Sequence, residues 1–130
     1  MREIDLRGTV FSGKGEGKKF IALPWVKAQI QEKLGFTPYP GTLNIRLAEE
    51  SVKQKKLLEK AKQLQICPEK GYCTGKLISA HIGSLECAVI IPQVPNYPND
   101  VLEVIAPWCL RERLNLIDGC EVTITVVLVF

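Results

Sequence analysis

Alternating apolar and polar residues recur along the chain and predict a fold built mainly from β-strands. In a strand that is buried on one face, every second side chain is apolar, and this period of two marks several segments. The predicted strands cover residues 4–10, 43–47, 75–82, 85–91, 101–105 and 122–130. Gly83-Ser84 predicts a tight hairpin between two of them, and Asp118-Gly119 predicts a turn before the last strand.

Helical signals are fewer than strand signals. Pro24 suits a first-turn position, Val26 and Ile30 lie four residues apart, and Gly35 is typical of a helix end, so a helix is predicted over 24–34. Similar patterns predict a short helix over 107–114 and a lysine-rich surface helix over 49–65. Because closure removes exposed strand edges, many short strands with few helices favour a closed or nearly closed β-barrel.

Size and composition indicate one domain, residues 1–130, whose core needs no disulfides. The chain has 130 residues, of which 46% are hydrophobic and 24% charged. No apolar stretch approaches the roughly 20 residues of a membrane-spanning helix, and the N-terminus lacks the apolar core of a signal peptide, so a cytoplasmic protein without a membrane partner is expected. The formal net charge of +3, with interspersed signs, suits a small anionic ligand better than nucleic acid.

The cysteine and histidine pattern argues against a metal or redox centre. The cysteines are spread out with no C-x-x-C pair, and the single histidine is His81. The cysteines are expected to be reduced and mostly buried, and His81 is expected to have a structural or surface role. The five cysteines are Cys67, Cys73, Cys87, Cys109 and Cys120.

A glycine-rich segment directly after the first predicted strand is the first candidate site. Glycines at positions 13, 15 and 17 let the backbone approach a ligand and aim N–H groups at one anion, and three lysines add positive charge. This chemistry suits a phosphate. The segment would equally suit a hairpin tip with solvated lysines, and it matches neither the Walker A spacing nor a G-x-G-x-x-G turn that opens a helix.

The predicted strand at 43–47 carries the second candidate. Its apolar residues would face the core, which places Thr42, Asn44 and Arg46 together on the other face. A hydroxyl and an amide oxygen two residues apart are hard ligands that suit Mg²⁺ when phosphates and waters complete its coordination. An ordinary polar strand face is the other interpretation.

Glu103 is the third candidate. Val101 and Ile105 share its strand face, and burial between them would raise its pKa toward that of a general base, whereas a solvated or arginine-paired carboxylate is the alternative. The next predicted helix begins near Trp108, which could stack on a ring or simply pack, and its first N–H groups could bind an anion or a base edge.

Together these segments resemble the archaeal CTP-dependent riboflavin kinases from Gly8 to the last strand. The resemblance rests on the order and spacing of GTVFSGKGEG at 8–17, LGFTPYPGTLN at 34–44, VIAPWCLR at 104–111 and LIDG at 116–119. It implies a mainly β fold, a compact cradle-loop (riboflavin-kinase-like) β-barrel with a few short helices. It also implies transfer of the γ-phosphoryl group of CTP to the 5′-hydroxyl of riboflavin, giving FMN and CDP.

The resemblance also implies roles for individual residues. Thr42 and Asn44 would ligate Mg²⁺ as the cofactor, and Glu103 would be a catalytic residue on the flavin side, near the accepting hydroxyl. Relatives carry a hydroxyl-bearing flavin contact near Pro95 or Asn96, for which Asn96, Tyr97 or Asn99 are the candidates here. The implied nucleotide-binding residues are Lys14, Gly15, Glu16, Gly17, Lys18, Lys19, Trp108, Cys109, Leu110 and Arg111.

Two other classes of function stay open. A non-catalytic barrel module that binds DNA would need a coherent basic face, whereas the lysines here are divided between the glycine segment and residues 53–62. A sensor would bind flavin or nucleotide without turnover. The kinase interpretation instead predicts CTP/CDP and riboflavin/FMN as ligands, no nucleic acid, and a monomer.

Overall fold

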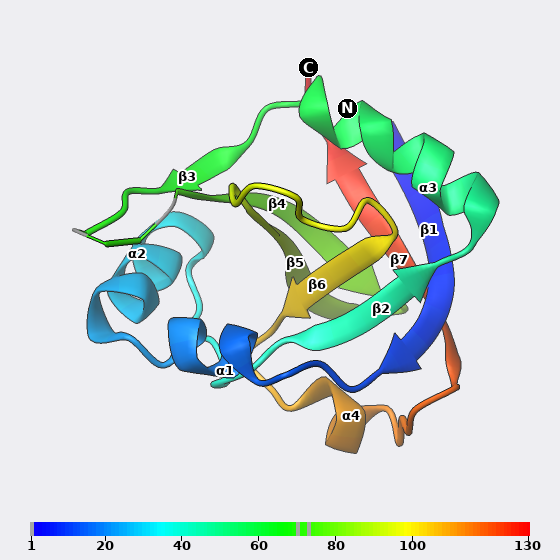
Figure 1. The fold of residues 1–130 in the computed structure, drawn as a ribbon, viewed down its shortest axis with the longest axis horizontal. Helices are drawn as coiled ribbons and strands as arrows, with labels where there is room; N and C mark the ends of the chain where they lie inside the picture. Colours follow the sequence, from blue (N-terminus) through cyan, green and yellow to red (C-terminus); the bar gives the residue numbers. More distant parts are fainter. Residues whose placement is uncertain (1, 70, 73) are drawn as a thin grey trace.

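One antiparallel sheet curls into a barrel in the computed structural model, which describes residues 2–69, 71–72 and 74–130 (Figure 1). The strand order is β3-β4-β5-β6-β2-β1-β7, and β4 also pairs with β7, so six strands close the barrel while β3 extends the sheet beside β4. The predicted fold class, a mainly β barrel with a few short helices, is confirmed. The strands are β1 (Arg2–Phe11), β2 (Leu43–Leu47), β3 (Leu64–Ile66), β4 (Gly75–Ile82), β5 (Leu85–Pro92), β6 (Val101–Ile105) and β7 (Glu121–Leu128).

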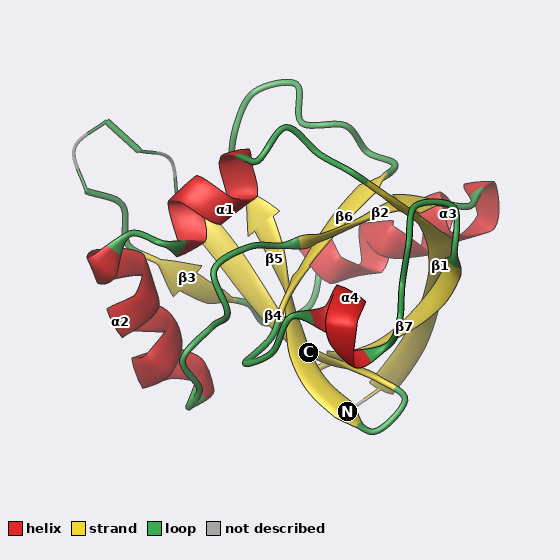
Figure 2. Ribbon diagram, turned by 90° about the horizontal axis from the view of Figure 1, so that it is seen from below, coloured by secondary structure: helices red, strands yellow, loops and turns green. Residues whose placement is uncertain are grey.

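Short helices surround this barrel. Helices α1 (Glu16–Ile21) and α2 (Pro24–Leu34) join β1 to β2, α3 (Glu49–Lys55) continues into one 3₁₀ turn, η1 (Lys56–Glu59), and α4 (Leu110–Arg113) precedes β7. Figure 2 shows α2 beside β3 and α3 beside β1, and these pairs of elements are in contact. No helix in the described part of the chain is long and apolar enough to cross a membrane.

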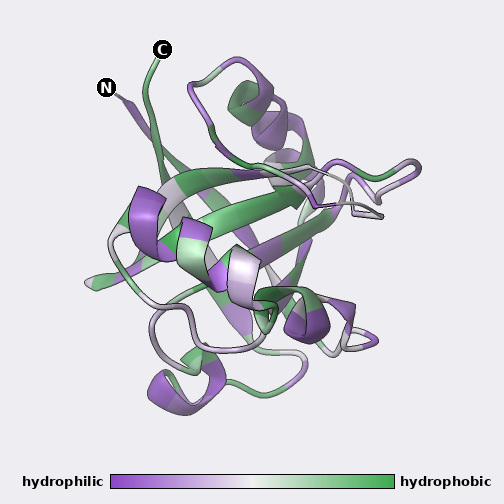
Figure 3. Cartoon of the chain, turned by 90° about the vertical axis from the view of Figure 1, so that its left-hand side faces the viewer, coloured by the Kyte–Doolittle hydropathy of each residue, from purple (hydrophilic) through white to green (hydrophobic). Residues whose placement is uncertain are grey.

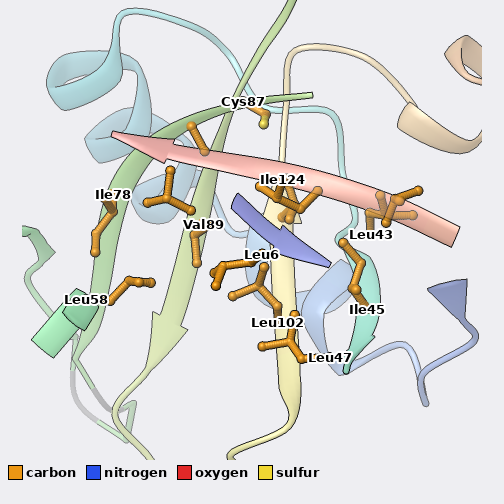
Figure 4. Packing of buried hydrophobic residues seen from close by; sticks show 14 of the residues in the cluster. Leu6, Leu43, Ile45, Leu47, Leu58, Ile78, Cys87, Val89, Leu102 and Ile124 are labelled. Atoms are coloured by element: carbon orange, nitrogen blue, oxygen red, sulfur yellow. The ribbon is translucent and has the colours of Figure 1, made fainter. Parts of the chain in front are cut away.

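Apolar cores lie on both faces of the sheet. The first fills the barrel and contains Leu6, Val89 and Leu102, each 1% exposed or less (Figure 4). The second lies between the first two helices and the outer face of β4 and β5, where Ile30 packs with Leu77. Figure 3 accordingly shows hydrophobic strands behind helices with hydrophilic outer faces. Since each fully buried aliphatic side chain contributes about 1.5–3 kcal/mol, the two cores hold the sheet and the helices together.

The second core fixes where the candidate site can lie. Strand β5 is buried on both faces because alternate residues enter different cores, Val89 the barrel and Ile90 the outer core. Strand β6 continues the same alternation, with Leu102 and Val104 inside the barrel and Glu103 on the outer face. The outer face of β5, β6 and β2 is therefore the surface that α1 and its preceding glycine segment can cover.

Local signals predicted α2 and the hairpin well. Helix α2 spans the predicted residues, with Pro24 in its first turn and Gly35 closing it at a left-handed φ of 80°. Strands β4 and β5 form the predicted hairpin around Gly83, whose φ is 57°. Strand β7 also follows the predicted turn at Gly119.

The surface helix predicted over 49–65 is too long. Helix α3 ends at Lys55, η1 adds a tighter turn, and residues 64–66 form β3 against β4. Leu58 and Ala61 pack into the barrel core, and pairing with β4 satisfies the backbone of β3. These tertiary interactions outweigh the helix propensity of a lysine-rich segment.

The prediction that the cysteines are mostly buried is wrong for the described ones. Cys87 is buried in the barrel core, but Cys67 is exposed and Cys109 and Cys120 are only partly buried. These three lie at the ends of strands and helices, where side chains reach solvent more easily than inside a sheet. All four are free thiols, and Cys73 lies outside the described residues.

Candidate active site

A row of polar side chains crosses the outer face of β2 and β6. The strand register sets Asn44 opposite Glu103, and Glu103 opposite Ile90 on β5. Thr42 and Arg46 also line this face, while the apolar residues between them are buried in the barrel, as the period of two predicted. The sheet thus presents hydroxyl, amide, carboxylate and guanidinium groups next to an apolar wall.

Three oxygen-bearing side chains of this row are in direct contact. The Thr42 Oγ1 lies 3.1 Å from Asn44 Oδ1 and 3.0 Å from Glu103 Oε1, so its single proton is shared between two acceptors. Glu103 is partly buried, and the donors to its carboxylate among the described residues are Thr42 and Tyr97. Among the described residues, Glu103 is therefore paired with two hydroxyl groups and not with an arginine.

The loop before β6 closes one side of this cluster. Tyr97 donates a 2.5 Å hydrogen bond to Glu103 Oε2, so both carboxylate oxygens accept a bond from a protein hydroxyl. Burial, with a further contribution from this contact with Glu103, raises the pKa of the Tyr97 phenol well above its usual range. The phenol is therefore protonated at neutral pH and acts as a donor.

The glycine-rich segment lies directly over the polar row. Gly15, at a φ of 83°, precedes α1, and Gly17 lies within that helix. A Cβ on residue 13 would come 2.5 Å from Asn44 Nδ2, and one on residue 17 would come 2.8 Å from Glu103 Oε1. The glycines therefore allow the backbone to approach the reactive side chains, and the hairpin-tip alternative does not describe this helix-forming segment.

Arg111 of α4 reaches the other end of the glycine segment. Its Nη2 donates to the Phe11 carbonyl oxygen at 3.1 Å and to Asp118 Oδ1 at 2.7 Å. Ser12 donates to the same carboxylate, and these contacts, that of Arg111 first, hold the pKa of Asp118 below its ordinary value. A network of α4, the predicted turn at 118–119 and the end of β1 thus fixes the guanidinium.

Apart from Asp118, these groups line one cavity of about 730 Å³, a size typical of small-molecule sites. Among the described residues that line it, four are cationic, namely Lys14, Lys18, Arg46 and Arg111, against two carboxylates. The far wall is apolar and aromatic, and Phe20, Trp25 and Tyr72 pack edge to face beside it. One end of the cavity suits an anion and the other suits a flat apolar ring.

The sequence-predicted site residues divide into two groups. Those that line the cavity are Lys14, Gly15, Glu16, Gly17, Lys18, Thr42, Asn44, Glu103 and Arg111. Of the remaining described ones, Leu110 is buried in the barrel core and Trp108 packs on that core beneath the Arg113 guanidinium, 4.8 Å from the ring centroid. Lys19, Asn96 and Cys109 also lie outside the lining of the cavity.

Sequence reasoning missed two features of this site. The resemblance suggests Tyr97 as one candidate flavin contact, but its bond to Glu103 depends on a loop conformation that no local pattern encodes. The sequence predicts Lys55 on a surface helix, yet it is partly buried and its Nζ donates to the Val101 carbonyl oxygen at 2.9 Å. A single lysine within a lysine-rich run carries no signal that would single it out.

The donor set is compatible with a magnesium ion. The Thr42 hydroxyl and the Asn44 amide oxygen are adjacent hard ligands that open onto the cationic end of the cavity, where phosphate oxygens and waters could complete the coordination. No cluster of three or more His, Cys, Asp or Glu residues suited to a metal occurs among the described residues. A metal bound here would therefore depend on the ligand that accompanies it.

A family model named CTP-dep_RFKase, with the description "Domain of unknown function DUF120", matches residues 10–126. The chain belongs to the archaeal CTP-dependent riboflavin kinase family. The match covers every residue that lines the cavity, from Phe11 to Arg111. The resemblance noted in the sequence is thereby confirmed at the level of the family.

Individual relatives in this family are archaeal riboflavin kinases. The chain is 38% identical to that of Methanosarcina barkeri over 93% of this chain and 56% of the relative, and 38% identical to that of Archaeoglobus fulgidus over 96% of this chain and 55% of the relative. For Saccharolobus solfataricus the identity is 41%, over 97% of this chain and 75% of the relative. The chain thus spans little more than half the length of the first two relatives.

Proposed function

We propose that this protein is a CTP-dependent riboflavin kinase, which transfers the γ-phosphoryl group of CTP to the 5′-hydroxyl of riboflavin and releases FMN and CDP. One observation carries the proposal: the Thr42, Asn44 and Glu103 oxygens meet in the same cavity as the glycine segment. Phosphoryl transfer needs a backbone that can bind phosphate and a carboxylate that can lie beside the substrate hydroxyl that receives the phosphoryl group. The names of the matching family model and of its relatives support CTP and riboflavin as the two substrates.

The two ends of the cavity suit the two substrates. Lys14, Lys18 and Arg111 would bind the phosphates of the nucleotide, together with backbone N–H groups of the glycine segment. Phe20, Tyr72 and the apolar wall of β5 would contact the isoalloxazine ring of riboflavin. The ribityl chain would then run toward Glu103, which lies between the two ends.

Mg²⁺ is the cofactor we propose, held by Thr42 Oγ1 and Asn44 Oδ1. When bound, this ion would neutralise negative charge on the phosphate oxygens. To bind the ion, the Thr42 hydroxyl would have to point its proton away from Asn44. Glu103 Oε1, at 3.0 Å, is available to accept the hydrogen bond from that hydroxyl. The contact between Thr42 and Glu103 therefore leaves the Thr42 oxygen lone pairs free for the cation.

Glu103 would act on the riboflavin hydroxyl. In the transfer, a bond forms between the 5′-oxygen and the γ-phosphorus while the bond from that phosphorus to the β,γ-bridging oxygen breaks, and the hydroxyl proton passes to the Glu103 carboxylate. The transition state is loose, so orientation of the hydroxyl contributes more than early proton removal. General bases of this kind contribute on the order of 10²–10⁴-fold.

The test is direct incubation of the purified protein with riboflavin, Mg²⁺ and either CTP or ATP, followed by chromatography of flavins and nucleotides. FMN and CDP in equal amounts with CTP, and little FMN with ATP, would support both the reaction and the donor. FMN with ATP alone would contradict the donor assignment. Ligand binding without FMN from either nucleotide would contradict the kinase and favour a sensor.

A further inference from the structure

The Tyr97 hydroxyl is tied to the carboxylate on which the proposed reaction depends. Tyr97 belongs to the loop between β5 and β6, residues 93–100, and donates to Glu103 Oε2 at 2.5 Å. Because Thr42 holds Oε1 from the opposite side, the carboxylate is fixed between two hydroxyl donors. A carboxylate with both oxygens bonded has few rotamers left.

Lys55 holds the base of the same loop from outside the cavity. Its Nζ donates to the carbonyl oxygens of Val101 at 2.9 Å and Asn99 at 3.4 Å, and lies 5.7 Å from the centroid of the Tyr97 ring. A cation over an aromatic face at this distance is attracted to the ring. Lys55 does not itself line the cavity, so it can affect the cavity only through the loop or through its charge.

Carboxylates near Lys55 stabilise its partly buried ammonium. Desolvation lowers the pKa of Lys55, and the carboxylates of Asp100, Glu59 and Glu103 oppose that shift. Asp100 also pairs with Arg46 at 3.4 Å, and its carbonyl oxygen accepts a 2.7 Å bond from the Leu47 N–H. The base of the loop is therefore attached to both β2 and α3.

We infer that Tyr97 is a positioning residue for Glu103 and that Lys55, on the far side of the loop, keeps Tyr97 in place. This inference rests on the proposed function, since it assigns residues to the proposed phosphoryl transfer. Neither residue needs to touch the transferring phosphoryl group. Removing either would leave Glu103 held by Thr42 alone, so the carboxylate could shift relative to the 5′-hydroxyl. A misplacement of about 1 Å can reduce a rate roughly 100-fold.

The kinetic test uses Tyr97→Phe, Lys55→Met and the double variant, with Lys53→Met as the matched control on an exposed position of α3. Tyr97→Phe should lower kcat about 10-fold with little change in KM for CTP, because the glycine segment is untouched. Lys55→Met should lower kcat less, and the double variant should be no slower than Tyr97→Phe alone. Unchanged kcat in Tyr97→Phe, or losses in the two single variants that multiply, would overturn the inference.

A second measurement does not depend on turnover. Urea unfolding of Tyr97→Phe, Glu103→Leu and the double variant gives the coupling between the two side chains. Each substitution changes the equilibrium constant of unfolding by some factor. The product of the factors for the two single variants should exceed the factor for the double variant by at least about threefold. If the wild-type protein forms no FMN, the proposed function fails, and this cycle alone tests the contact between Tyr97 and Glu103. A double-variant factor equal to the product of the two single-variant factors would show no coupling and would overturn the inference.

Discussion

The α-carbon of Gly17 faces the Thr42 hydroxyl so closely that a methyl group on residue 17 would lie 2.5 Å from Oγ1. The same methyl group would lie 2.8 Å from Glu103 Oε1. Gly17 has ordinary helical backbone geometry in α1, where alanine is intrinsically more favourable by about 1 kcal/mol. Glycine at this position therefore serves access to the site and not the stability of the helix.

Gly17→Ala should separate activity from stability. The new methyl group must displace Thr42 or Glu103, so we expect kcat to fall roughly 10- to 100-fold. The gain in helix propensity should offset much of the steric cost, so the midpoint of thermal unfolding should change by only a few degrees. Steady-state FMN formation and a thermal melt of the same preparation check both points. Full activity in a folded Gly17→Ala protein would show that the close approach has no functional role.

Thr42 allows a sharper test of the proposed magnesium site. Thr42→Val removes the hydroxyl while keeping the shape, and Thr42→Ser keeps the hydroxyl on a smaller side chain. We expect Thr42→Val to weaken Mg²⁺-dependent CTP binding at least about 10-fold and Thr42→Ser to retain most of it. Calorimetric titration with CTP, with and without Mg²⁺, measures this. Equal affinities for the two variants would remove the Thr42 oxygen from the metal site.

Replacement of Glu103 should affect the rate and spare nucleotide binding. Glu103→Gln keeps the size and one acceptor oxygen but can no longer take up the hydroxyl proton, so kcat should fall on the order of 10²–10⁴-fold. CTP affinity should stay close to that of the wild-type protein, because Lys14, Lys18 and Arg111 line the cavity independently. Glu121→Gln, at an exposed position of β7, is the matched control. Wild-type turnover in Glu103→Gln would remove this carboxylate from the mechanism.

Local patterns carried most of the fold and part of the site. Pro24 and Gly35 mark both ends of α2, and the period of two around Asn44 was enough to place it on the outer face of β2 with Thr42 and Arg46. These features depend on neighbours within a few residues. The sequence therefore predicts them without knowledge of the tertiary structure.

Features set by distant contacts were not predictable in this way. The pairing of residues 64–66 with β4 converts the end of an apparent helix into β3, and the Lys55 bond to Val101 joins residues 46 positions apart. The glycines of the segment at 13–17 suggested a phosphate-binding loop, and they also allow α1 to lie on the polar row. How close they come to Glu103 depends on how the strands of the sheet pair, which the local sequence does not encode. The family resemblance suggested the residue roles that are proposed above and that the pattern alone left open.

His81 should make stability depend on pH near neutrality. A hydrogen bond to Glu3 at 2.8 Å, and a second to the Gly83 carbonyl oxygen, raise the pKa of His81 above its ordinary value of 6.5. The resulting stabilisation is fully present below a pH of about 6.5 and is lost as the pH rises through the raised folded-state pKa. Because the pair is largely solvated, it should contribute less than about 1 kcal/mol.

His81→Gln should flatten that pH dependence. Urea unfolding of the wild-type protein and the variant between pH 5.5 and about 8.5, a range that extends to about two units above the ordinary histidine pKa, measures the difference. The wild-type advantage should shrink as the pH rises, and Glu3→Gln should produce the same flattening because it removes the other partner. Parallel stability curves for wild type and His81→Gln would contradict this assignment.

Asp118 should tune the nucleotide end of the cavity through Arg111. The carboxylate accepts bonds from Arg111 Nη2 at 2.7 Å and from the Ser12 hydroxyl at 2.8 Å, and it lies outside the cavity lining. Asp118→Asn keeps the shape and removes the charge, so Arg111 should be held less firmly. Because the pair is partly exposed, KM for CTP should rise only about threefold, with kcat and KM for riboflavin nearly unchanged.

The control is Asp5→Asn, since the Asp5 carboxylate also accepts a hydrogen bond, from Thr125 on β7. This substitution should leave all three constants unchanged. An unchanged KM for CTP in Asp118→Asn would mean that the bonds from Arg111 to the end of β1 suffice to hold its guanidinium.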